Sequence, residues 1–171
     1  MISSIFSLAF IGLCLQAAAK DVRTLTIPNW MNISIAALFL PAALVGGLGL
    51  SLTGWHLLAG LIAFVVSFGL FAVGAYGGGD AKMIPAVILW MGPEGILPFL
   101  FGMALAGGLL SIVLVLARKA VPADIAPGFA RSVLASDAGI PYGVAIAAGA
   151  IYALPHSPLF TEFLSRFSQF G

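Results

Sequence analysis

Long apolar runs separated by short polar connections make up most of this chain. Six of them approach or reach the length of a membrane-crossing helix, near residues 2–19, 31–50, 55–76, 81–91, 96–117 and 140–154. The apolar residues within each run are continuous rather than alternating, which favours α-helices over the strands of a barrel. The pattern predicts an all-α membrane protein, a polytopic bundle of about six transmembrane helices, folded as a single domain over residues 1–171.

Composition supports this class and narrows the chemistry. Hydrophobic residues make up 61% of the chain and charged residues only 8%, against about 25% charged residues in soluble domains. A single cysteine, Cys14, excludes an internal disulfide and a four-cysteine metal site, and the two histidines lie far apart in the sequence. We therefore expect no metal and no cofactor. Because no basic face with interleaved aromatic residues is present, we expect no nucleic-acid partner.

The basic residues orient the predicted helices. Under a six-span topology, six of the seven lysines and arginines fall on one side, which the positive-inside rule makes cytoplasmic: Lys20, Arg23, Lys82, Arg118, Lys119 and Arg131. This arrangement requires residues 81–91 to cross the bilayer, although eleven residues are short for a hydrocarbon core of about 30 Å. It places the 118–137 loop in the cytoplasm, and Met1 and the tail outside.

Both ends of the chain allow a specific prediction. Ala17–Ala19 resembles a signal-peptide cleavage site, but no basic residue precedes the first apolar run, so we expect an uncut first helix. In the tail, residues 158–170 carry aromatic and aliphatic residues at helical spacing, which predicts a short amphipathic helix at the membrane interface. His56, at the outer edge of its predicted span, is expected to be interfacial rather than a ligand.

The most informative polar position is Asp80, which follows the glycine run Gly77, Gly78 and Gly79 between two apolar segments. Three consecutive glycines carry an entropic cost that a segment only spanning lipid would avoid, and they permit close approach of the backbone to another group. An ionisable residue at the edge of a membrane segment indicates a functional site. Lys82, two positions later, points to another side of the helix, and we expect it to extend towards the headgroups.

A second carboxylate, Asp21, lies in the loop after the first predicted helix. Pro28 favours an extended Ile27, and Asn29 is a suitable cap for the following helix. The order of spans brings Asp21 and Asp80 to the same side of the membrane. Two readings of Asp21 follow from the loop alone: an ion pair with Lys20 or Arg23, or a partner for Asp80.

Two carboxylates at one membrane face suit aspartyl hydrolysis. When two such groups approach closely they share one proton. The ionised member then takes a proton from water, while the protonated member polarises the scissile carbonyl. If Asp21 is not the partner of Asp80, Asp124 and Asp137 are the next candidates.

Three motifs resemble those of one protein family. Gly77-Gly78-Gly79-Asp80-Ala81-Lys82 resembles the GxGD signature of intramembrane aspartyl proteases. Asp21 followed by Arg23, Ile27, Pro28 and Asn29 resembles the first-aspartate loop of the prepilin peptidases, and Pro141-Tyr142-Gly143 resembles the late helix start of the same family. The resemblance extends from the first predicted helix to the sixth and implies that Asp21 and Asp80 are the catalytic pair.

The resemblance also implies a substrate and a location. The chain is similar to the short peptidases of Flp-type, tight-adherence pili, which remove the leader of prepilins or pseudopilins at the cytoplasmic face of the bacterial inner membrane and work beside the pilus assembly machinery. Longer members resemble this chain plus a cysteine-rich domain with N-methyltransferase activity. This chain has no CxxC pair, so we expect no methylation.

Two other classes of function remain open from the sequence. Intramembrane acids and glycine-broken helices also mark ion and proton pathways, so a transporter is the main alternative. Both acids, however, are predicted at one face rather than at the midplane, and no inverted repeat is visible. The other alternative is a non-catalytic membrane subunit of a pilus machine.

Overall fold

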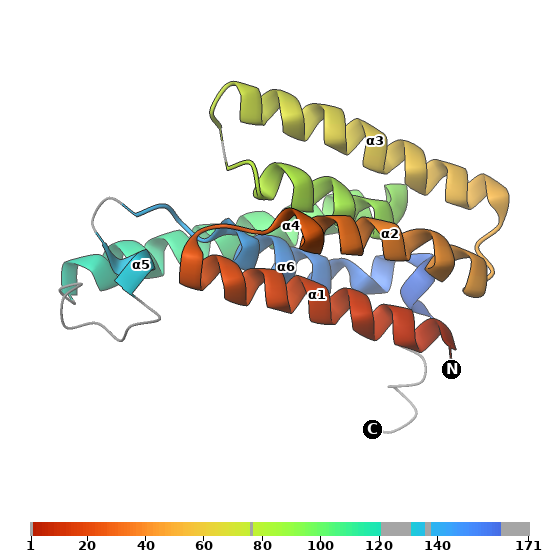
Figure 1. Cartoon of the computed structure of the whole chain (residues 1–171), viewed down its shortest axis with the longest axis horizontal. Helices are drawn as coiled ribbons and strands as arrows, with labels where there is room; N and C mark the ends of the chain where they lie inside the picture. The colour runs from red at the N-terminus through yellow and green to blue at the C-terminus, as the bar shows by residue number, and fades with distance from the viewer. Residues whose placement is uncertain (1, 76, 121–130, 136–137, 162–171) are drawn as a thin grey trace.

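The structure, a computed structural model, describes residues 2–75, 77–120, 131–135 and 138–161, and its elements there are all helical (Figure 1). They are α1 (Ile2–Thr24), α2 (Asn29–Val45), α3 (Leu50–Ala72), α4 (Asp80–Ala120), α5 (Arg131–Leu134) and α6 (Tyr142–Ala153), followed by two short 3₁₀ turns, Leu154–His156 and Pro158–Phe160. Of these, α1, α3 and α4 are long and apolar enough to cross a membrane, and α2 is a shorter apolar helix. The prediction of an all-α fold is confirmed, and three helices have the length and hydropathy of membrane spans, whereas six crossings stay a prediction.

Helix α4 is two helical segments joined at a reversal. A straight helix of 41 residues would be about 60 Å long, yet Asp80, Met103 and Arg118 line one cavity. The reversal occurs at Gly92, whose φ of 67° and ψ of −179° are not helical. Glycine adopts this positive φ without the steric cost that a side chain would add. Residues 80–91 therefore run away from the cavity and residues 93–120 run back to it (Figure 1), as the Gly-Pro-Glu-Gly sequence predicts.

The reversal explains why His56 is not interfacial. Its side chain is fully buried, and its ring lies where a β-carbon on Gly92 would be. Its Nδ1 is 2.9 Å from the Leu89 carbonyl oxygen, and its ring stacks on Phe39 at a centroid distance of 5.6 Å. The interfacial prediction was wrong because α3 packs on the turn of α4, and that contact is not visible in the local sequence.

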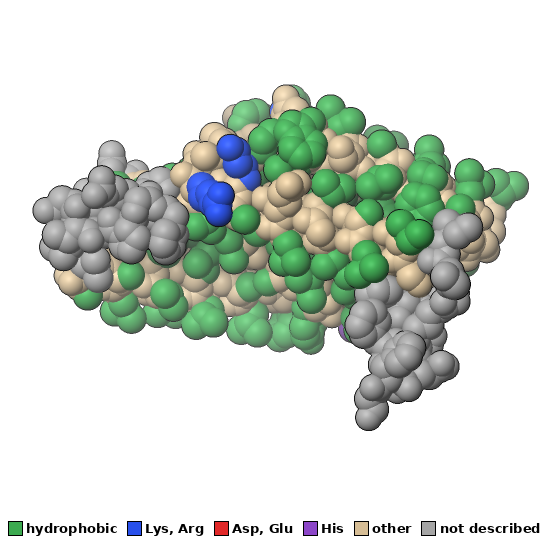
Figure 2. Space-filling view, turned by 60° about the horizontal axis from the view of Figure 1, so that its bottom comes forward, with side chains coloured by type: hydrophobic (Ala, Val, Ile, Leu, Met, Phe, Trp, Pro, Cys, Tyr) green, Lys and Arg blue, Asp and Glu red, His purple; other side chains and the backbone are tan. Residues whose placement is uncertain are grey.

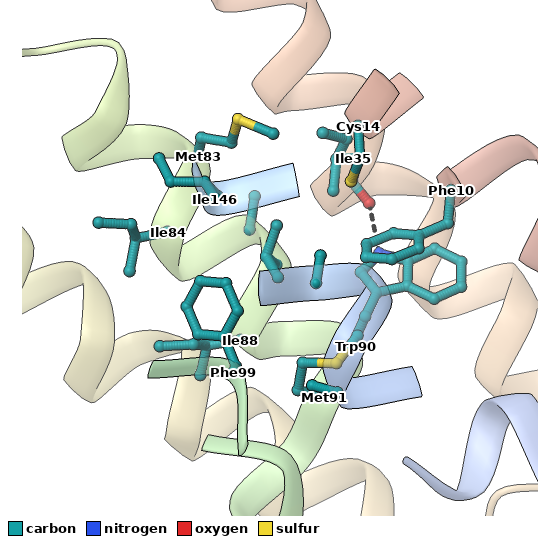
Figure 3. Close-up of a cluster of buried hydrophobic side chains, with 14 of the residues drawn as sticks. Phe10, Cys14, Ile35, Met83, Ile84, Ile88, Trp90, Met91, Phe99 and Ile146 are labelled. Carbon is teal, nitrogen blue, oxygen red and sulfur yellow. Dashed lines mark hydrogen bonds between the residues drawn. The ribbon is translucent and has the colours of Figure 1, made fainter. Parts of the chain in front are cut away.

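An aromatic cluster joins the helices at the end of the bundle near this reversal. Trp90 packs against Phe10, with ring centroids 4.7 Å apart, and against Phe160 at 5.9 Å. The Trp90 indole N–H donates to the Ile35 carbonyl oxygen at 2.7 Å (Figure 3), and the Ser157 hydroxyl donates to the Trp90 carbonyl oxygen at 2.6 Å. Burial of these rings fixes α1, α2 and α4 relative to one another.

Phe160 also corrects the prediction for the tail. Residues 158–160 form a 3₁₀ turn, and Phe160 is fully buried against Phe10 rather than lying at the interface. The rest of the predicted amphipathic helix lies outside the described residues, as do Asp124 and Asp137.

The outer surface matches the membrane assignment. Many large apolar side chains of α3 and the second half of α4 are exposed, including Leu61, Val65, Leu105 and Leu109. On the face shown in Figure 2, hydrophobic side chains are spread over most of the described surface, while the visible lysines and arginines gather in one place. A surface of this kind is suited to lipid rather than to water.

Candidate active site

Asp21 and Asp80 line the same cavity at one end of the bundle. The cavity has a volume of about 750 Å³ and is lined by Asp21, Leu25, Ala75, Gly77, Asp80, Met103, Arg118, Ala138, Gly139, Ile140 and Tyr142. Asp21 comes from the last turn of α1, Asp80 is the first residue of α4, and Tyr142 begins α6. These three helix ends lie at the same end of the molecule (Figure 1).

The boundary of α1 differs from the prediction. The helix continues to Thr24, so Lys20, Asp21 and Arg23 lie in its last turns rather than in a loop. Helical geometry turns Asp21 into the bundle, where it is buried, while Lys20 and Arg23 are exposed. The ion-pair alternative for Asp21 is therefore not the arrangement found.

Asp21 is held by the start of α6. The Gly143 backbone N–H donates to Asp21 Oδ2 at 2.8 Å, and this N–H lies in the first turn of the helix, where it has no partner within the helix. A β-carbon on Gly143 would lie 3.0 Å from both Cβ and Oδ2 of Asp21 and 3.1 Å from Cδ1 of Ile27. Only glycine allows this approach without displacing the carboxylate, which gives the Pro141-Tyr142-Gly143 sequence a physical function.

The other two residues of that sequence also take part. Pro141 is fully buried at the N-cap of α6. Tyr142 lines the cavity, and its ring packs close to Gly107 of α4, where a β-carbon would lie 3.3 Å from the ring and from the hydroxyl oxygen. The start of α6 is thus fixed against α4 on one side and against Asp21 on the other.

Asp80 is positioned by the glycine turn before it. The Gly77 backbone N–H donates to the Asp80 carboxylate, and Gly78 lies against the ring of Phe71. A β-carbon on Gly79 would lie 3.2 Å from Cβ and 3.3 Å from the backbone nitrogen of Ile27. The Asn32 side-chain amide reaches the Gly79 carbonyl oxygen at 3.4 Å.

Ile27 therefore lies between the two segments that carry the aspartates. It is 6% exposed, and it contacts Gly79 next to Asp80 and Gly143 next to Asp21. Pro28 after it is extended, with φ −62° and ψ 142°. In the sequence, Ile27 is only one residue of a motif, and its role as a spacer between two distant glycines could not be predicted.

Arg118 is a site residue that the sequence analysis interpreted only as a cytoplasmic cation. It lines the cavity with both aspartates. Its Nε donates to the Val133 carbonyl oxygen and its Nη2 to the Gly139 carbonyl oxygen, both at 2.9 Å. The guanidinium thereby holds the segment that leads into Pro141 and Gly143.

This geometry predicts that Arg118→Ala lowers kcat/KM for the reaction at this site by a factor on the order of ten or more, because a charged hydrogen bond contributes about 1.5–3 kcal/mol. Arg118→Lys should recover only part of the activity, because a lysine ammonium group does not reproduce the planar geometry in which the guanidinium donates to two carbonyl oxygens. The exposed neighbour Lys119 provides the matched control, Lys119→Ala. Equal activity of Arg118→Ala and Lys119→Ala would contradict a role in positioning.

Lys82 is exposed and does not line the cavity that contains the two aspartates, and its extension towards the headgroups stays a prediction. Its Nζ donates to Asn29 Oδ1 at 2.8 Å. Asn29 in turn does not cap α2, whose N-cap is Pro28, and no side-chain capping bond is formed there. The packing of α2 on α4 brings the two side chains together. The capping prediction for Asn29 was wrong because α2 already begins at Asn29.

A metal site would need several His, Cys, Asp or Glu side chains close together. Within the described residues, no three His, Cys, Asp or Glu side chains gather as a metal site. Asp21 and Asp80 are the two carboxylates that line the cavity.

The fold and the site define a helical membrane protein with two carboxylates, the buried Asp21 and the half-buried Asp80, in a cavity at one end of its bundle. Its family follows from comparison: the type IV leader peptidase family model matches residues 8–112, and the chain belongs to this family. The resemblance seen in the motifs is thereby confirmed, and membership implies a leader peptidase activity. The match includes Asp21 and Asp80 but ends before Pro141. No curated protein and no solved structure matches the chain.

Proposed function

We propose that this protein is an aspartic-type endopeptidase that removes the leader peptide of prepilin or pseudopilin precursors, with Asp21 and Asp80 as its catalytic pair. The observation that carries the proposal is the shared cavity, in which two carboxylates from distant parts of the chain face the same space. Each carboxylate accepts a backbone N–H from a glycine, Gly143 for Asp21 and Gly77 for Asp80. These bonds fix their orientation, which catalysis by paired groups requires.

The chemistry follows from the proximity of the two acids. Two nearby carboxylates in a partly buried site share one proton. The ionised carboxylate accepts a proton from a water molecule, which attacks the scissile carbonyl carbon, and the protonated carboxylate donates to the carbonyl oxygen. Collapse of the tetrahedral intermediate then releases the new amino terminus and the new carboxylate.

The substrate and location come from the resemblance to the short peptidases of Flp-type pili. In this proposal the cavity lies at the cytoplasmic face of the inner membrane, the basic leader stays in the cytoplasm, and cleavage occurs after the last glycine of the leader. Methyl transfer is not part of the proposed function. The pilus assembly machinery is the proposed partner downstream of cleavage.

The direct test is to incubate the purified protein, reconstituted in lipid vesicles, with a purified Flp-type prepilin and to determine the product by mass spectrometry. A shortened pilin beginning directly after the leader glycine is expected. An unchanged prepilin, together with proton or ion flux through the same vesicles, would instead favour the transporter alternative.

A hydrolysis carried out by two carboxylates is expected to continue in the presence of a chelator. Addition of EDTA to the same assay should therefore leave the rate of leader removal unchanged within twofold. Loss of cleavage that one specific divalent metal restores would mean that Asp21 and Asp80 bind an ion, and the proposed mechanism would be wrong.

A further inference from the structure

A second cavity, apolar and unused by the chemistry above, lies between α3 and both halves of α4. It has a volume of about 300 Å³ and is lined by Ala59, Ile62, Ala63, Val66, Ser67, Leu70, Ile84, Ile88, Ile96, Leu100 and Met103. This volume is roughly ten times the share of one water molecule in the liquid, which is enough for a large apolar side chain. We refer to it below as the α3/α4 cavity.

The α3/α4 cavity continues from the catalytic cavity. Met103 lines both of them. Asp80, Ile84 and Ile88 follow each other at intervals of four residues, so they lie along one face of α4. Ile84 and Ile88 project to the same side of that helix, away from Trp90 (Figure 3). A chain that enters the catalytic cavity next to Asp80 therefore reaches Ile84 and Ile88 directly beyond it.

The α3/α4 cavity has a closed floor and an open edge. The floor residues Ala63, Ile84 and Ile88 are buried, with exposures of 9%, 7% and 4%. The edge residues Val66 and Leu70 of α3 are 54% and 42% exposed on the lipid-facing surface. An apolar segment that already lies in the bilayer can enter through this edge without leaving a hydrocarbon environment.

We propose that the α3/α4 cavity is the substrate subsite that receives the apolar residues directly following the cleaved bond. This inference rests on the proposed function and extends it to a specificity determinant. A lining of aliphatic side chains excludes the charged leader, because an unpaired charge in such surroundings costs several kcal/mol. It accepts the apolar segment that begins after the leader, and so sets the direction in which the substrate lies across Asp21 and Asp80.

A groove on the other side of the same helix is a less suitable subsite. That groove lies between α2, α3 and α4, and Lys82, Asn29 and Asn32 form its polar end. Lys82 is two residues from Asp80 and therefore points to the opposite side of α4. The groove shares no lining residue with the catalytic cavity, so a peptide in it would have to pass around α4 to reach the carboxylates.

The first test fills the α3/α4 cavity from its floor. The variant Ala63→Leu and the control Gly69→Leu are reconstituted in lipid vesicles, and kcat/KM is measured for two Flp-type prepilins. One prepilin has Phe directly after the cleaved bond and the other has Ala. At Gly69, on the same helix, an added β-carbon meets nothing within 4 Å. Because a methylene-sized misfit in an apolar pocket changes kcat/KM by about 10–200-fold, Ala63→Leu should reduce cleavage of the Phe substrate at least tenfold more than that of the Ala substrate. Gly69→Leu should leave the ratio unchanged.

An equal loss for both substrates, or an unchanged ratio in Ala63→Leu, would overturn the subsite. It would mean that the α3/α4 cavity holds only lipid acyl chains. Failure of the proposed function is a separate result, because in that case the wild-type protein would cleave neither prepilin, or Asp80→Asn would still cleave both.

The second test measures proximity and does not depend on turnover. The background is the inactive, cysteine-free variant Cys14→Ser, Asp80→Asn, into which either Val66→Cys or Val65→Cys is introduced. Each variant is oxidised together with a prepilin that carries one cysteine in the first residues of its apolar segment. Val65 is 63% exposed but does not line the cavity, so it is a matched neighbour. A disulfide-linked product with Val66→Cys at least fivefold above Val65→Cys is expected. Equal products from the two positions would overturn the proposal.

Discussion

Replacement of either Asp21 or Asp80 by asparagine is expected to abolish leader removal while the protein still inserts and accumulates. Neither carboxylate can both accept the water's proton and donate to the carbonyl, and an amide of similar shape can exchange neither proton. Loss of one member of such a unit lowers kcat by a factor on the order of 10⁴ or more. The rate of prepilin cleavage at matched protein levels is the measurement.

The pair should behave as one unit in further variants. The double mutant Asp21→Asn, Asp80→Asn should be no less active than either single mutant, because residues that act together are not additive. Asp→Glu at either position should cost about 100-fold, since an added methylene moves the oxygens by about 1 Å. Glu94→Gln is the control, because Glu94 is an exposed acid next to the reversal of α4. Near-normal cleavage by Asp21→Asn would remove Asp21 from the mechanism and leave Asp124 and Asp137 as candidates.

The second large effect is expected at Gly143. A side chain there would crowd Asp21 and Ile27, because the added β-carbon would lie 3.0 Å from Cβ and Oδ2 of Asp21 and 3.1 Å from Cδ1 of Ile27, and the Asp21 Cβ is attached directly to the backbone of α1. Gly143→Ala should therefore shift the Asp21 carboxylate by a few tenths of an ångström and reduce kcat by a factor on the order of ten, since 1 Å of misplacement costs about 100-fold. Gly143→Val should be inactive. KM should change much less than kcat, because the variant moves a reacting group rather than a binding surface.

The control for this prediction is a glycine in open surroundings. At Gly108 of α4, an added β-carbon meets nothing within 4 Å, and Gly108→Ala should keep full activity. If Gly143→Ala cleaves prepilin at the wild-type rate, the close approach of α6 to Asp21 has no catalytic importance, although the rest of the dyad proposal would stand.

The sequence by itself determined the class of this protein and the location of its carboxylates. In the bilayer core, backbone N–H and C=O groups have no water to bind. A continuous apolar run is therefore stable there as a helix, which forms its backbone hydrogen bonds internally, so the all-α membrane class follows from a local pattern. The reversal of α4 also follows locally, because Gly92 and Pro93 interrupt an apolar run. The positions of Lys20, Arg23 and Lys82 were enough to place Asp21 and Asp80 at the same end.

Only the tertiary structure decided which residues support these two aspartates. Ile27 lies between Gly79 and Gly143, and Arg118 holds the chain that leads into α6. His56 is buried on the turn of α4, and Lys82 binds Asn29. Each of these contacts joins residues at least 21 positions apart. Hydrophobic periodicity reports which side of a helix is apolar, but it contains no information on which distant helix end will contact that side, and packing of whole helices makes that choice.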